Sequence, residues 1–416
     1  MRETTNLEYK REVSRTYLKT VSAFANYGTG EVLFGVADDG AVLGIADPAA
    51  ACLRIENEIN DSLNPVPLFS LNVDGDTRVI TLTVQEGPEK PYLYKGKAYR
   101  RADSSTVEVG PLELRRLVLL GTNTTFDAVM SNDQDLSFKI LERELRRKIG
   151  LDALDKNALI SLELANSSGL FNNAAALLAD ENHFPGIDIA RFGPSINIIL
   201  SRRTIEKSSL LTQMSEAMAA FDEYYSYEVI EGAKRISKCL IPREAFREAV
   251  ANALVHRRWD VPASIKISMF ESRIEVSSPG SLPEDLSEEA YRAGGPSIAR
   301  NPVLANVFYR LGYIERFGTG IPRILEAYAA MIASPTFAIT PSSITVTLPI
   351  DEENIFSDNE RLMLNALTKG TSFSRAEISE ATGMSKDKAI RVLNDLLEKN
   401  AIFKTGSGRS VRYARR

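Results

Sequence analysis

The sequence predicts an α+β protein of several domains. At 416 residues the chain is longer than one ordinary domain, because globular domains average about 100 to 200 residues. Hydrophobic residues make up 44% and charged residues 25%, which is typical of folded globular proteins rather than of disordered or fibrous ones. Apolar stripes with helical spacing alternate with short segments of strand-like alternation, so helices and strands are mixed along the chain.

The sequence argues against a membrane-spanning protein and against a protein with a signal peptide. The longest apolar runs fall well short of the roughly 18 residues that a membrane-spanning helix requires, and the charged segment Met1–Glu12 cannot be the apolar core of a signal peptide. We therefore expect a soluble, cytoplasmic protein without a membrane partner. The two cysteines, Cys52 and Cys239, and the two histidines, His183 and His256, lack the spacing of a structural zinc site.

The sequence of residues 1–120 predicts a first domain that contains both helices and strands. Apolar residues between Tyr17 and Ala25 form one helical stripe, and a glycine-containing break separates it from a strand at Glu31–Val36. Strands are expected to dominate up to about Asp103. Hairpin turns are predicted at Asp38–Gly40, Asp74–Gly75 and Lys95–Gly96.

Residues 121–350 predict a second domain of helices and strands. The pattern is helical up to about Leu178, with a polar linker at Ser131–Asp135, and a β stretch follows near Ile187–Leu200. The further elements expected are helices at Ile205–Tyr225 and Pro242–Arg257 and strands at Ile265–Phe270 and Arg273–Ser277.

Residues 358–416 differ in charge from the rest of the chain. From Asn359 onward, 12 lysines and arginines face 6 acidic residues, a net charge of +6, and the preceding residues carry −11. Ser374 and Glu377 form a capping box that begins a short helix. A second helix, Ser385–Lys399, precedes two strands around a glycine-containing loop. Two helices joined by a turn and followed by a basic β-wing predict a winged helix-turn-helix.

This charge and topology favour DNA as the partner. In a winged helix-turn-helix the second helix enters the major groove and the wing contacts the phosphate backbone. A winged helix used only for protein contacts or dimerisation is the alternative, and the positive charge favours DNA. The expected contacts are Lys386, Lys388 and Arg391 in the second helix and Arg409 and Arg412 in the wing.

Carboxylates near the N-terminus are candidates for catalysis. If Leu7–Lys10 is extended, Glu8 and Lys10 project from the same face of the strand. Glu3 and Asp38 would complete a three-carboxylate cluster that suits Mg²⁺ or Mn²⁺, and Lys10 would stabilise charge developing on a phosphate. These residue types fit metal-dependent phosphodiester hydrolysis. The alternative is a solvent-exposed ion pair between Glu8 and Lys10.

Aromatic and basic residues alternate between residues 92 and 101. Such a hairpin can follow a nucleic-acid backbone and stack on bases. Alternatively, it is an edge strand that is protected by charge and whose tyrosines pack inward. The cations expected to contact nucleic acid are Lys97, Arg100 and Arg101.

A polar stripe in the helix Pro242–Arg257 is a candidate nucleotide site. Glu248, Asn252 and His256 follow one another at four-residue intervals, so they share one face of the helix. An acid, an amide and an imidazole in this arrangement can orient a metal-bound triphosphate and an attacking water. The alternative is a core or capping histidine with ordinary turn glycines. Residues expected to approach the nucleotide through their backbone are Gly280, Gly318, Thr319 and Gly320.

Motifs in residues 1–110 resemble the Schlafen AlbA-type domain. They are Glu3-x4-Glu8-Tyr-Lys10, Phe34-Gly-Val-Ala-Asp38-Asp-Gly40 and Tyr99-Arg-Arg-Ala-Asp-Ser104-Ser. The resemblance implies an AlbA-like fold that handles nucleic acid. It also implies a nuclease centre at Glu3, Glu8 and Asp38. Bacterial proteins with this domain are usually described as transcriptional regulators.

Further motifs look like a divergent ATPase domain related to gyrase, Hsp90, histidine kinases and MutL, which is a GHKL-like α/β sandwich. They are Arg247–Arg257, Ile274–Pro283, Arg300–Ala305 and Gly318–Ile321. By this resemblance Glu248 is the water-orienting base, Asn252 a Mg²⁺ ligand and Gly318–Gly320 part of a phosphate lid. The adenine-reading aspartate of that family has no counterpart beside Gly280, so ATP binding is implied more firmly than hydrolysis.

The leading hypothesis is a DNA-binding, nucleotide-responsive transcriptional regulator that uses ATP and Mg²⁺ or Mn²⁺. Its activity as an enzyme would be that of a weak ATPase. The rival hypothesis is a divalent-metal-dependent, Schlafen-like nuclease that acts on RNA or single-stranded DNA. An assembly scaffold in which both sites have decayed is the third. DNA is the expected partner, with RNA and a second copy of the chain as further candidates.

Overall fold

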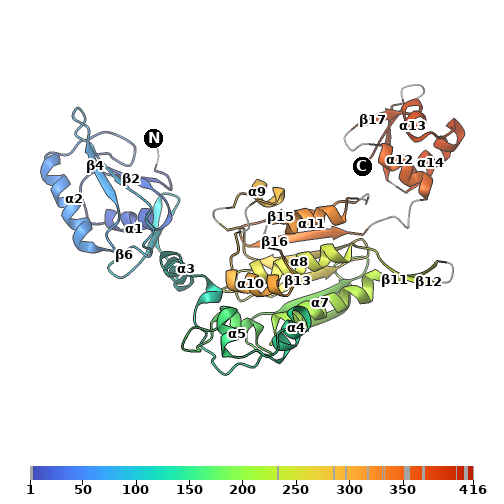
Figure 1. The fold of residues 1–416 in the computed structure, drawn as a ribbon. Helices are drawn as coiled ribbons and strands as arrows, with labels where there is room; N and C mark the ends of the chain where they lie inside the picture. The colour runs from blue at the N-terminus through green and yellow to red at the C-terminus, as the bar shows by residue number, and fades with distance from the viewer. Residues whose placement is uncertain are drawn as a thin grey trace. The chain divides into compact units, whose positions relative to one another are not determined.

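The computed structural model shows two compact units, Met1–Val129 and Met130–Arg416, and each is described here by itself (Figure 1). The mixed α+β composition is confirmed, because both units contain helices and sheets. Within the described residues, every helix is too short or too polar to cross a lipid bilayer. The described residues are 3–231, 234–283, 286–295, 298–315, 318–329, 331, 333–350, 357–367, 371–399, 401–406 and 411–415.

A four-stranded sheet forms the centre of the first unit. Its order is β1 (Leu7–Lys10), β2 (Gly30–Phe34), β5 (Ile80–Val84) and β4 (Phe69–Val73), and only the β1–β2 pair is parallel. Helix α1 (Tyr17–Tyr27) packs on it through its predicted apolar stripe, which is almost completely buried. The hairpin predicted at residues 74–75 joins β4 to β5.

A helix occupies part of the region for which we predicted strands. Helix α2 (Pro48–Ser62) is capped by Asp47, whose side chain accepts a hydrogen bond from the Ala50 backbone, and it has a proline in its first turn. Only Ile55 and Ile59 of this helix are buried, so its apolar stripe is narrow. The prediction that strands dominate this region therefore missed a helix. The remaining elements are β3 (Leu63–Asn64), β6 (Leu93–Tyr94), β7 (Tyr99–Ala102), β8 (Ser105–Glu108), α3 (Pro111–Gly121) and η1 (Phe126–Ala128).

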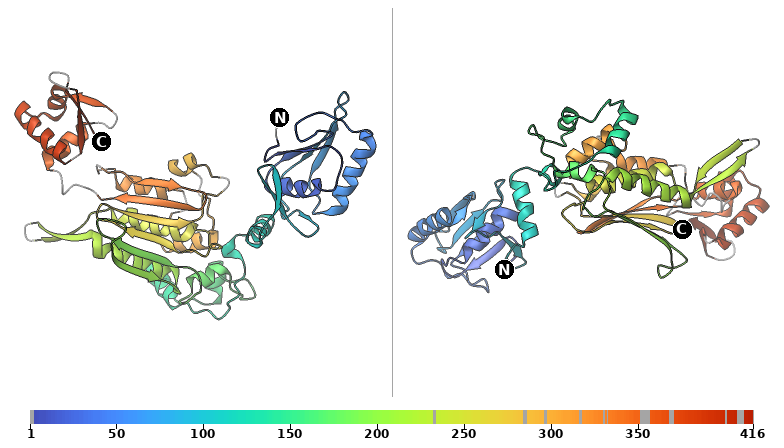
Figure 2. Two further views of the ribbon diagram at one scale, coloured as in Figure 1. Left: turned by 180° about the vertical axis from the view of Figure 1, so that it is seen from behind. Right: turned by 90° about the horizontal axis from the view of Figure 1, so that it is seen from below.

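A six-stranded sheet forms the centre of the second unit. One pair of neighbouring strands, β9 (Ile187–Phe192) and β13 (Ile265–Met269), is parallel, and all other neighbouring strands are antiparallel. Helices α7 (Leu210–Tyr225) and α8 (Arg243–His256) cover one face of the sheet, as Figure 2 shows. The order of the strands is β10 (Ile199–Ile205), β9 (Ile187–Phe192), β13 (Ile265–Met269), β14 (Arg273–Pro279), β16 (Ser343–Pro349) and β15 (Thr336–Ile339).

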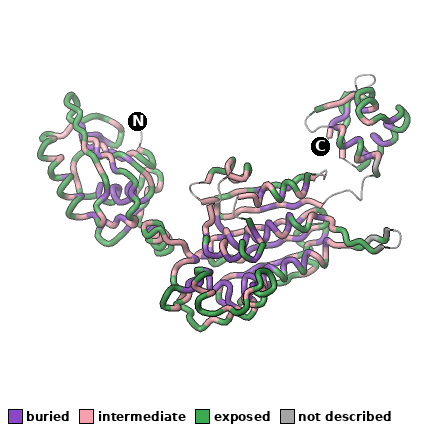
Figure 3. Tube along the Cα trace, in the orientation of Figure 1, coloured by how far each residue is buried: buried purple, intermediate pink, exposed green. Residues whose placement is uncertain are grey.

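The core of this unit lies between the two helices and the sheet, where buried positions concentrate along α7 and α8 (Figure 3). Phe221 of α7 stacks on Phe246 of α8 with their ring centroids 4.8 Å apart. Such a pair of buried rings fixes the spacing of two neighbouring helices. Other helices of the unit are α4 (Lys139–Ile149), α5 (Lys156–Ser161), α6 (Asn173–Leu178), α9 (Glu288–Ala293), α10 (Pro302–Arg310) and α11 (Gly320–Ala327).

An unpredicted β-ribbon connects α7 to α8. It consists of β11 (Ser226–Glu231) and β12 (Lys234–Cys239), which pair only with each other in the described sheets. The helix that we predicted from Ile205 begins at Leu210 instead, because β10 continues through Ile205 and Ser209 caps the helix.

The last part of the chain has its own hydrophobic cluster, in which Leu393, Leu396 and Tyr413 are buried. The predicted capping box is present: the Glu377 backbone donates to Ser374 Oγ, and the Ser374 backbone donates to the Glu377 carboxylate. Helix α12 was not predicted. The elements are α12 (Asp358–Ala366), β17 (Ser372–Ser374), α13 (Arg375–Thr382), α14 (Lys386–Glu398), β18 (Ile402–Thr405) and β19 (Arg412–Arg415), with sheet order β17-β19-β18.

Candidate nucleotide site

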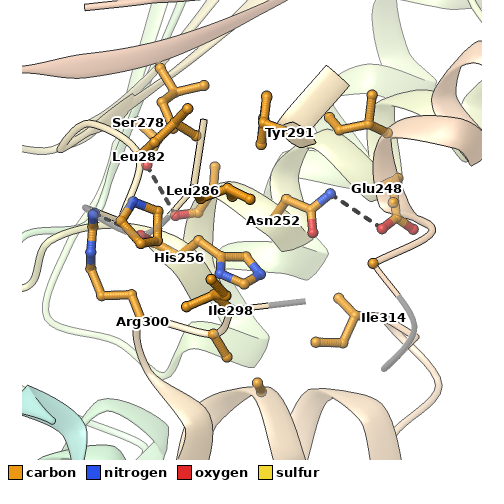
Figure 4. Close-up of a pocket in the computed structure, with 18 of the residues that line it drawn as sticks. Glu248, Asn252, His256, Ser278, Leu282, Leu286, Tyr291, Ile298, Arg300 and Ile314 are labelled. Atoms are coloured by element: carbon orange, nitrogen blue, oxygen red, sulfur yellow. Dashed lines mark hydrogen bonds between the residues drawn. The ribbon is translucent and has the colours of Figure 1, made fainter. Parts of the chain in front are cut away.

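The polar stripe of α8 faces a cavity of about 460 Å³ in the second unit (Figure 4). Glu248, Asn252 and His256 all line it, as their four-residue spacing on the helix requires. Asn252 Nδ2 donates a hydrogen bond to Glu248 Oε1 over 3.2 Å. The cavity has the size of many small-molecule sites.

Glu248 is a buried carboxyl group with an unused oxygen. The residue is only 3% exposed, and Oε2 accepts no hydrogen bond from the described residues. The nearest cation to this oxygen is Arg247, at 3.9 Å. Burial raises the pKa of Glu248 above its ordinary value, although the charges of Arg247 and Arg323 oppose the shift. A carboxylate with a raised pKa is suited to accept a proton from water.

Gly320, the first residue of α11, packs directly on this pair. A Cβ atom at Gly320 would lie 2.7 Å from Asn252 Nδ2 and 2.8 Å from Glu248 Oε1, so only glycine permits the close approach. Gly318 also lines the cavity and has a positive φ of 67°. Between them, Thr319 Oγ1 is buried without a hydrogen-bond partner among the described residues. The segment therefore brings the start of a helix to the cavity.

His256 lies at the opposite end of the stripe, near Arg300. Burial, and secondarily the charge of Arg300, lowers the pKa of His256 from 6.5 to about 4, so the imidazole is neutral at pH 7. Arg300 donates to the His256 carbonyl oxygen (3.3 Å) and to the Ser281 carbonyl oxygen (2.8 Å). A Cβ at Gly280, which has a φ of 105°, would collide with Arg258 and Arg300.

Several lining residues were missing from the predicted site. Arg300 belongs to the Arg-Asn-Pro motif noted in the sequence, and the motif could have indicated it. Asn301, its neighbour, donates to the carbonyl oxygens of Val255 and Arg257 and thereby holds the end of α8. Leu282 lies in the motif Ile274–Pro283, but no sequence signal indicated the other apolar and aromatic lining residues, which include Leu286, Tyr291, Ile298 and Ile314 (Figure 4).

A nucleotide with a divalent cation fits these residues. Glu248 Oε2 and Thr319 Oγ1 are buried polar atoms without hydrogen-bond partners in the described structure. Because Gly320 has no side chain, the backbone at the start of α11 can lie directly against Asn252. Of the residues predicted for this site, Glu248, Asn252, His256, Gly280, Gly318 and Gly320 line one cavity, and Thr319 lies between two of them.

The N-terminal carboxylates have a different environment from the one expected. Glu8, in β1, is buried: its side chain is 6% exposed and lies 2.6 Å from Lys10 Nζ. It also pairs with Arg101, and Thr20 Oγ1 donates to its Oε2 over 2.6 Å. Glu8 and Lys10 share a face as predicted, but the alternative of a solvent-exposed ion pair is wrong for Glu8.

The predicted three-carboxylate cluster is not formed. Among the described residues, no three histidine, cysteine, aspartate or glutamate side chains gather in a way that could hold a metal ion. Glu3 Oε1 accepts a hydrogen bond from the Tyr9 backbone (2.9 Å), and Asp38 is exposed in the turn after β2. The structure therefore gives no support to a metal centre built from Glu3, Glu8 and Asp38.

In the basic hairpin of residues 92–101 the tyrosines pack inward and charged residues protect the exposed side, which was the alternative to a nucleic-acid-binding hairpin. Its three tyrosines, at positions 92, 94 and 99, are buried in the core of the unit. Each predicted nucleic-acid contact is paired with a carboxylate: Lys97 with Glu108 (2.7 Å), Arg100 with Glu113 (3.5 Å) and the buried Arg101 with Glu8.

Exposed cations lie at the start of α14. Lys386, Lys388 and Arg391 are exposed, and none of them forms an ion pair with another described residue. Arg412, in contrast, donates to the Ser372 carbonyl oxygen and lies 3.5 Å from Glu377, so it joins β17, β19 and α13. Arg409 lies outside the described residues.

Family comparisons agree with both resemblances. Residues 3–110 match the family "Schlafen, AlbA_2", and residues 263–348 match the family "Putative ATP-dependent DNA helicase recG C-terminal". The chain thus contains a Schlafen AlbA_2 domain followed by a RecG-C-terminal-type, ATPase-like domain. The second match includes Gly280 and Gly318–Gly320 but begins after α8.

Individual proteins show more distant likeness. The solved DIP2311 protein of Corynebacterium diphtheriae is 19% identical, with a TM-score of 0.51 over 99% of this chain and 92% of its own, which is a likeness of fold. The N-terminal domain of a RecG-related protein from Nitrosomonas europaea is 27% identical over 25% of this chain and 83% of its own, with a TM-score of 0.20. The xylose repressor of Bacillus spizizenii is 33% identical over 60 residues, which are 14% of this chain and 16% of the repressor's length.

Proposed function

We propose that this protein is a DNA-binding transcriptional regulator that responds to ATP. Its three modules would be residues 1–120, 121–350 and 358–416. The observation that carries the proposal is the cavity at α8. The carboxyl group of Glu248 and the amide of Asn252 meet there at the first residue of α11, Gly320. The ATPase-like family match over residues 263–348 supports the same ligand.

Each residue of the stripe has a distinct role in this proposal. Asn252, through its amide oxygen, would ligate Mg²⁺ or Mn²⁺, which neutralises phosphate charge when bound. Glu248 would orient a water molecule with its free Oε2 and accept its proton, because burial raises its pKa. Backbone N–H groups at the start of α11 and the Thr319 hydroxyl would donate to phosphate oxygens. Neutral His256 would contribute a hydrogen-bonding group at the other end of the cavity.

The C-terminal residues would supply the contact with DNA. The element order α12-β17-α13-α14-β18-β19 supports the proposal of a winged helix-turn-helix, as does Gly383, which is in the left-handed region at the turn before α14. In such a module the start of the second helix enters the major groove, and here that start carries the exposed Lys386, Lys388 and Arg391. The xylose repressor is by its name a repressor, which supports regulation as the role.

Two measurements on the full chain test this function. In a thermal-shift titration, ATP with Mg²⁺ is expected to raise the melting temperature, and the Asn252→Ala variant is expected to lose this shift. In a fluorescence-anisotropy titration at fixed salt, ATP is expected to change the affinity for duplex DNA, because a ligand shifts only states that it binds differently. Absence of any ATP-dependent melting shift would contradict nucleotide binding, and an unchanged DNA affinity would contradict the regulatory response.

A further inference from the structure

A second cavity of the second unit has a volume of about 530 Å³ and shares no lining residue with the nucleotide cavity. It is bounded by α4, α7, the start of α8 and the turn at residues 312–313. Its lining contains five cationic side chains and two acidic ones. The cations are Arg143, Arg147, Lys148, Arg243 and Arg247, and the acids are Glu144 and Glu216.

Local ion pairs leave a positive excess in this cationic pocket. Glu144 lies 2.6 Å from Arg147 and 3.8 Å from Arg143, so one carboxylate serves two guanidinium groups. Lys148 lies 5.5 Å from the ring centroid of Tyr313. Of the remaining lining charges, Glu216 pairs with Arg203 (3.5 Å) and Arg243 pairs with Asp222 (2.8 Å), both partners lying outside the lining.

The kind of ligand follows from the type and number of the cations. Guanidinium groups bind phosphate oxygens through paired, charge-assisted hydrogen bonds. Several cations around one cavity match an anion with more than one charge, and the volume matches a small molecule rather than a long stretch of nucleic-acid backbone. We propose that the cationic pocket binds a small anion that carries two or more phosphate groups.

Arg247 connects this pocket to the nucleotide cavity. Its Nη1 donates to the Gly312 carbonyl oxygen (3.3 Å), and its Nη2 lies 3.9 Å from Glu248 Oε2. A bound polyphosphate would attract the Arg247 guanidinium and weaken its interaction with Glu248. We therefore expect occupancy of the cationic pocket to change the affinity for ATP, and this second step rests on the proposed function.

Isothermal titration of the full chain with inorganic pyrophosphate tests the pocket itself. Arg147→Gln and Arg143→Gln are each expected to weaken binding by about tenfold, because each removes a charge-assisted interaction with phosphate. Arg146→Gln is the matched control on the same helix, since Arg146 pairs with Glu142 and does not line the pocket. Equal affinity in wild type, Arg147→Gln and Arg143→Gln would overturn the proposal.

Two further arms identify the ligand and its location. If Asn252→Ala, rather than the arginine variants, loses pyrophosphate binding, the anion occupies the nucleotide cavity and the proposal is wrong. If a single-stranded oligonucleotide binds through Arg143 and Arg147 while pyrophosphate does not, the ligand is a nucleic-acid backbone, and the small-anion proposal is wrong.

The coupling is measured by titrating ATP with and without saturating pyrophosphate. Wild type is expected to show a changed ATP affinity, and Arg147→Gln at the same pyrophosphate concentration is expected to show none. An unchanged affinity in wild type would overturn the coupling. Failure of ATP to bind at all would instead contradict the proposed function, while Arg147-dependent pyrophosphate binding would still support the pocket.

Discussion

Asn252 and Glu248 are joined across one turn of α8 by a hydrogen bond of 3.2 Å, and Gly320 from α11 packs on both side chains. The amide is therefore oriented with its nitrogen toward the carboxylate, which leaves its oxygen available to a cation. Two segments about 70 residues apart meet at this point, so the sequence spacing within α8 and the glycine in α11 define the site together.

Replacing Gly320 with alanine should weaken ATP binding by about tenfold without unfolding the protein. The added Cβ would displace the ends of Asn252 and Glu248, which lie 2.7 and 2.8 Å from its position, and so disturb the groups assigned to the cation and the water. Gly75→Ala is the control, because a Cβ there meets nothing within 4 Å. Calorimetric ATP titration is the measurement, and equal affinities in the two variants would contradict the close-approach argument.

The stability of the second unit should depend on the protonation of His256. Its pKa is lowered to about 4 in the folded protein from an ordinary value of 6.5, first by burial and then by Arg300. Between these values the unfolded chain binds a proton that the folded chain does not, so the free energy of unfolding falls as the pH decreases from about 6.5 toward 4. His256→Gln should show a shallower dependence in urea unfolding between these pH values. An unchanged slope would refute this assignment.

Removing Glu8 should destabilise the first unit strongly. Glu8→Ala leaves the buried Arg101 without its carboxylate, and loss of one partner of a buried ion pair costs about 3–5 kcal/mol. The double variant Glu8→Ala, Arg101→Ala should lose less than the sum of the two single changes. Native-state hydrogen exchange of α1 and β1 measures the effect. Glu108→Ala, which breaks the exposed pair with Lys97, should leave that exchange unchanged.

Lys388→Ala and Arg391→Ala should each weaken binding to duplex DNA and lower the slope of log affinity against log salt by about one, as expected for a lost phosphate contact. Both side chains are exposed at the start of α14. Lys207→Ala, an exposed lysine of the second unit outside α14, should preserve the slope. If all three variants retain the wild-type slope, α14 does not contact DNA phosphates.

Local patterns were sufficient for the α8 stripe and for the capping box at Ser374. Both depend on residues three or four positions apart, for which helix geometry alone determines proximity. Helix α2 shows the limit of the same method. Its N-cap Asp47 and first-turn proline were visible in the sequence, but only Ile55 and Ile59 are buried, so the apolar periodicity was too weak to indicate a helix.

Long-range pairing was the part that sequence spacing could not supply. Arg101 was predicted as an exposed nucleic-acid contact, but it is buried because Glu8, 93 positions earlier, lies opposite it. Arg300 contributes to the nucleotide cavity from a segment 44 residues beyond His256. Only the folding of the sheet brings such pairs together, and their burial then decides whether a charge is a surface contact or an internal partner.

The β11–β12 ribbon has a consequence for how the second unit can be engineered. Its first and last residues, Ser226 and Cys239, are paired neighbours in the antiparallel ladder, so the chain leaves α7 and returns toward α8 at nearly the same place. Opposed residues in such a ladder are about 5 Å apart, a gap that a two-residue turn can close. We therefore expect that replacing residues 227–238 with a short turn keeps both helices in place, which circular dichroism and a thermal melt of the shortened chain would check.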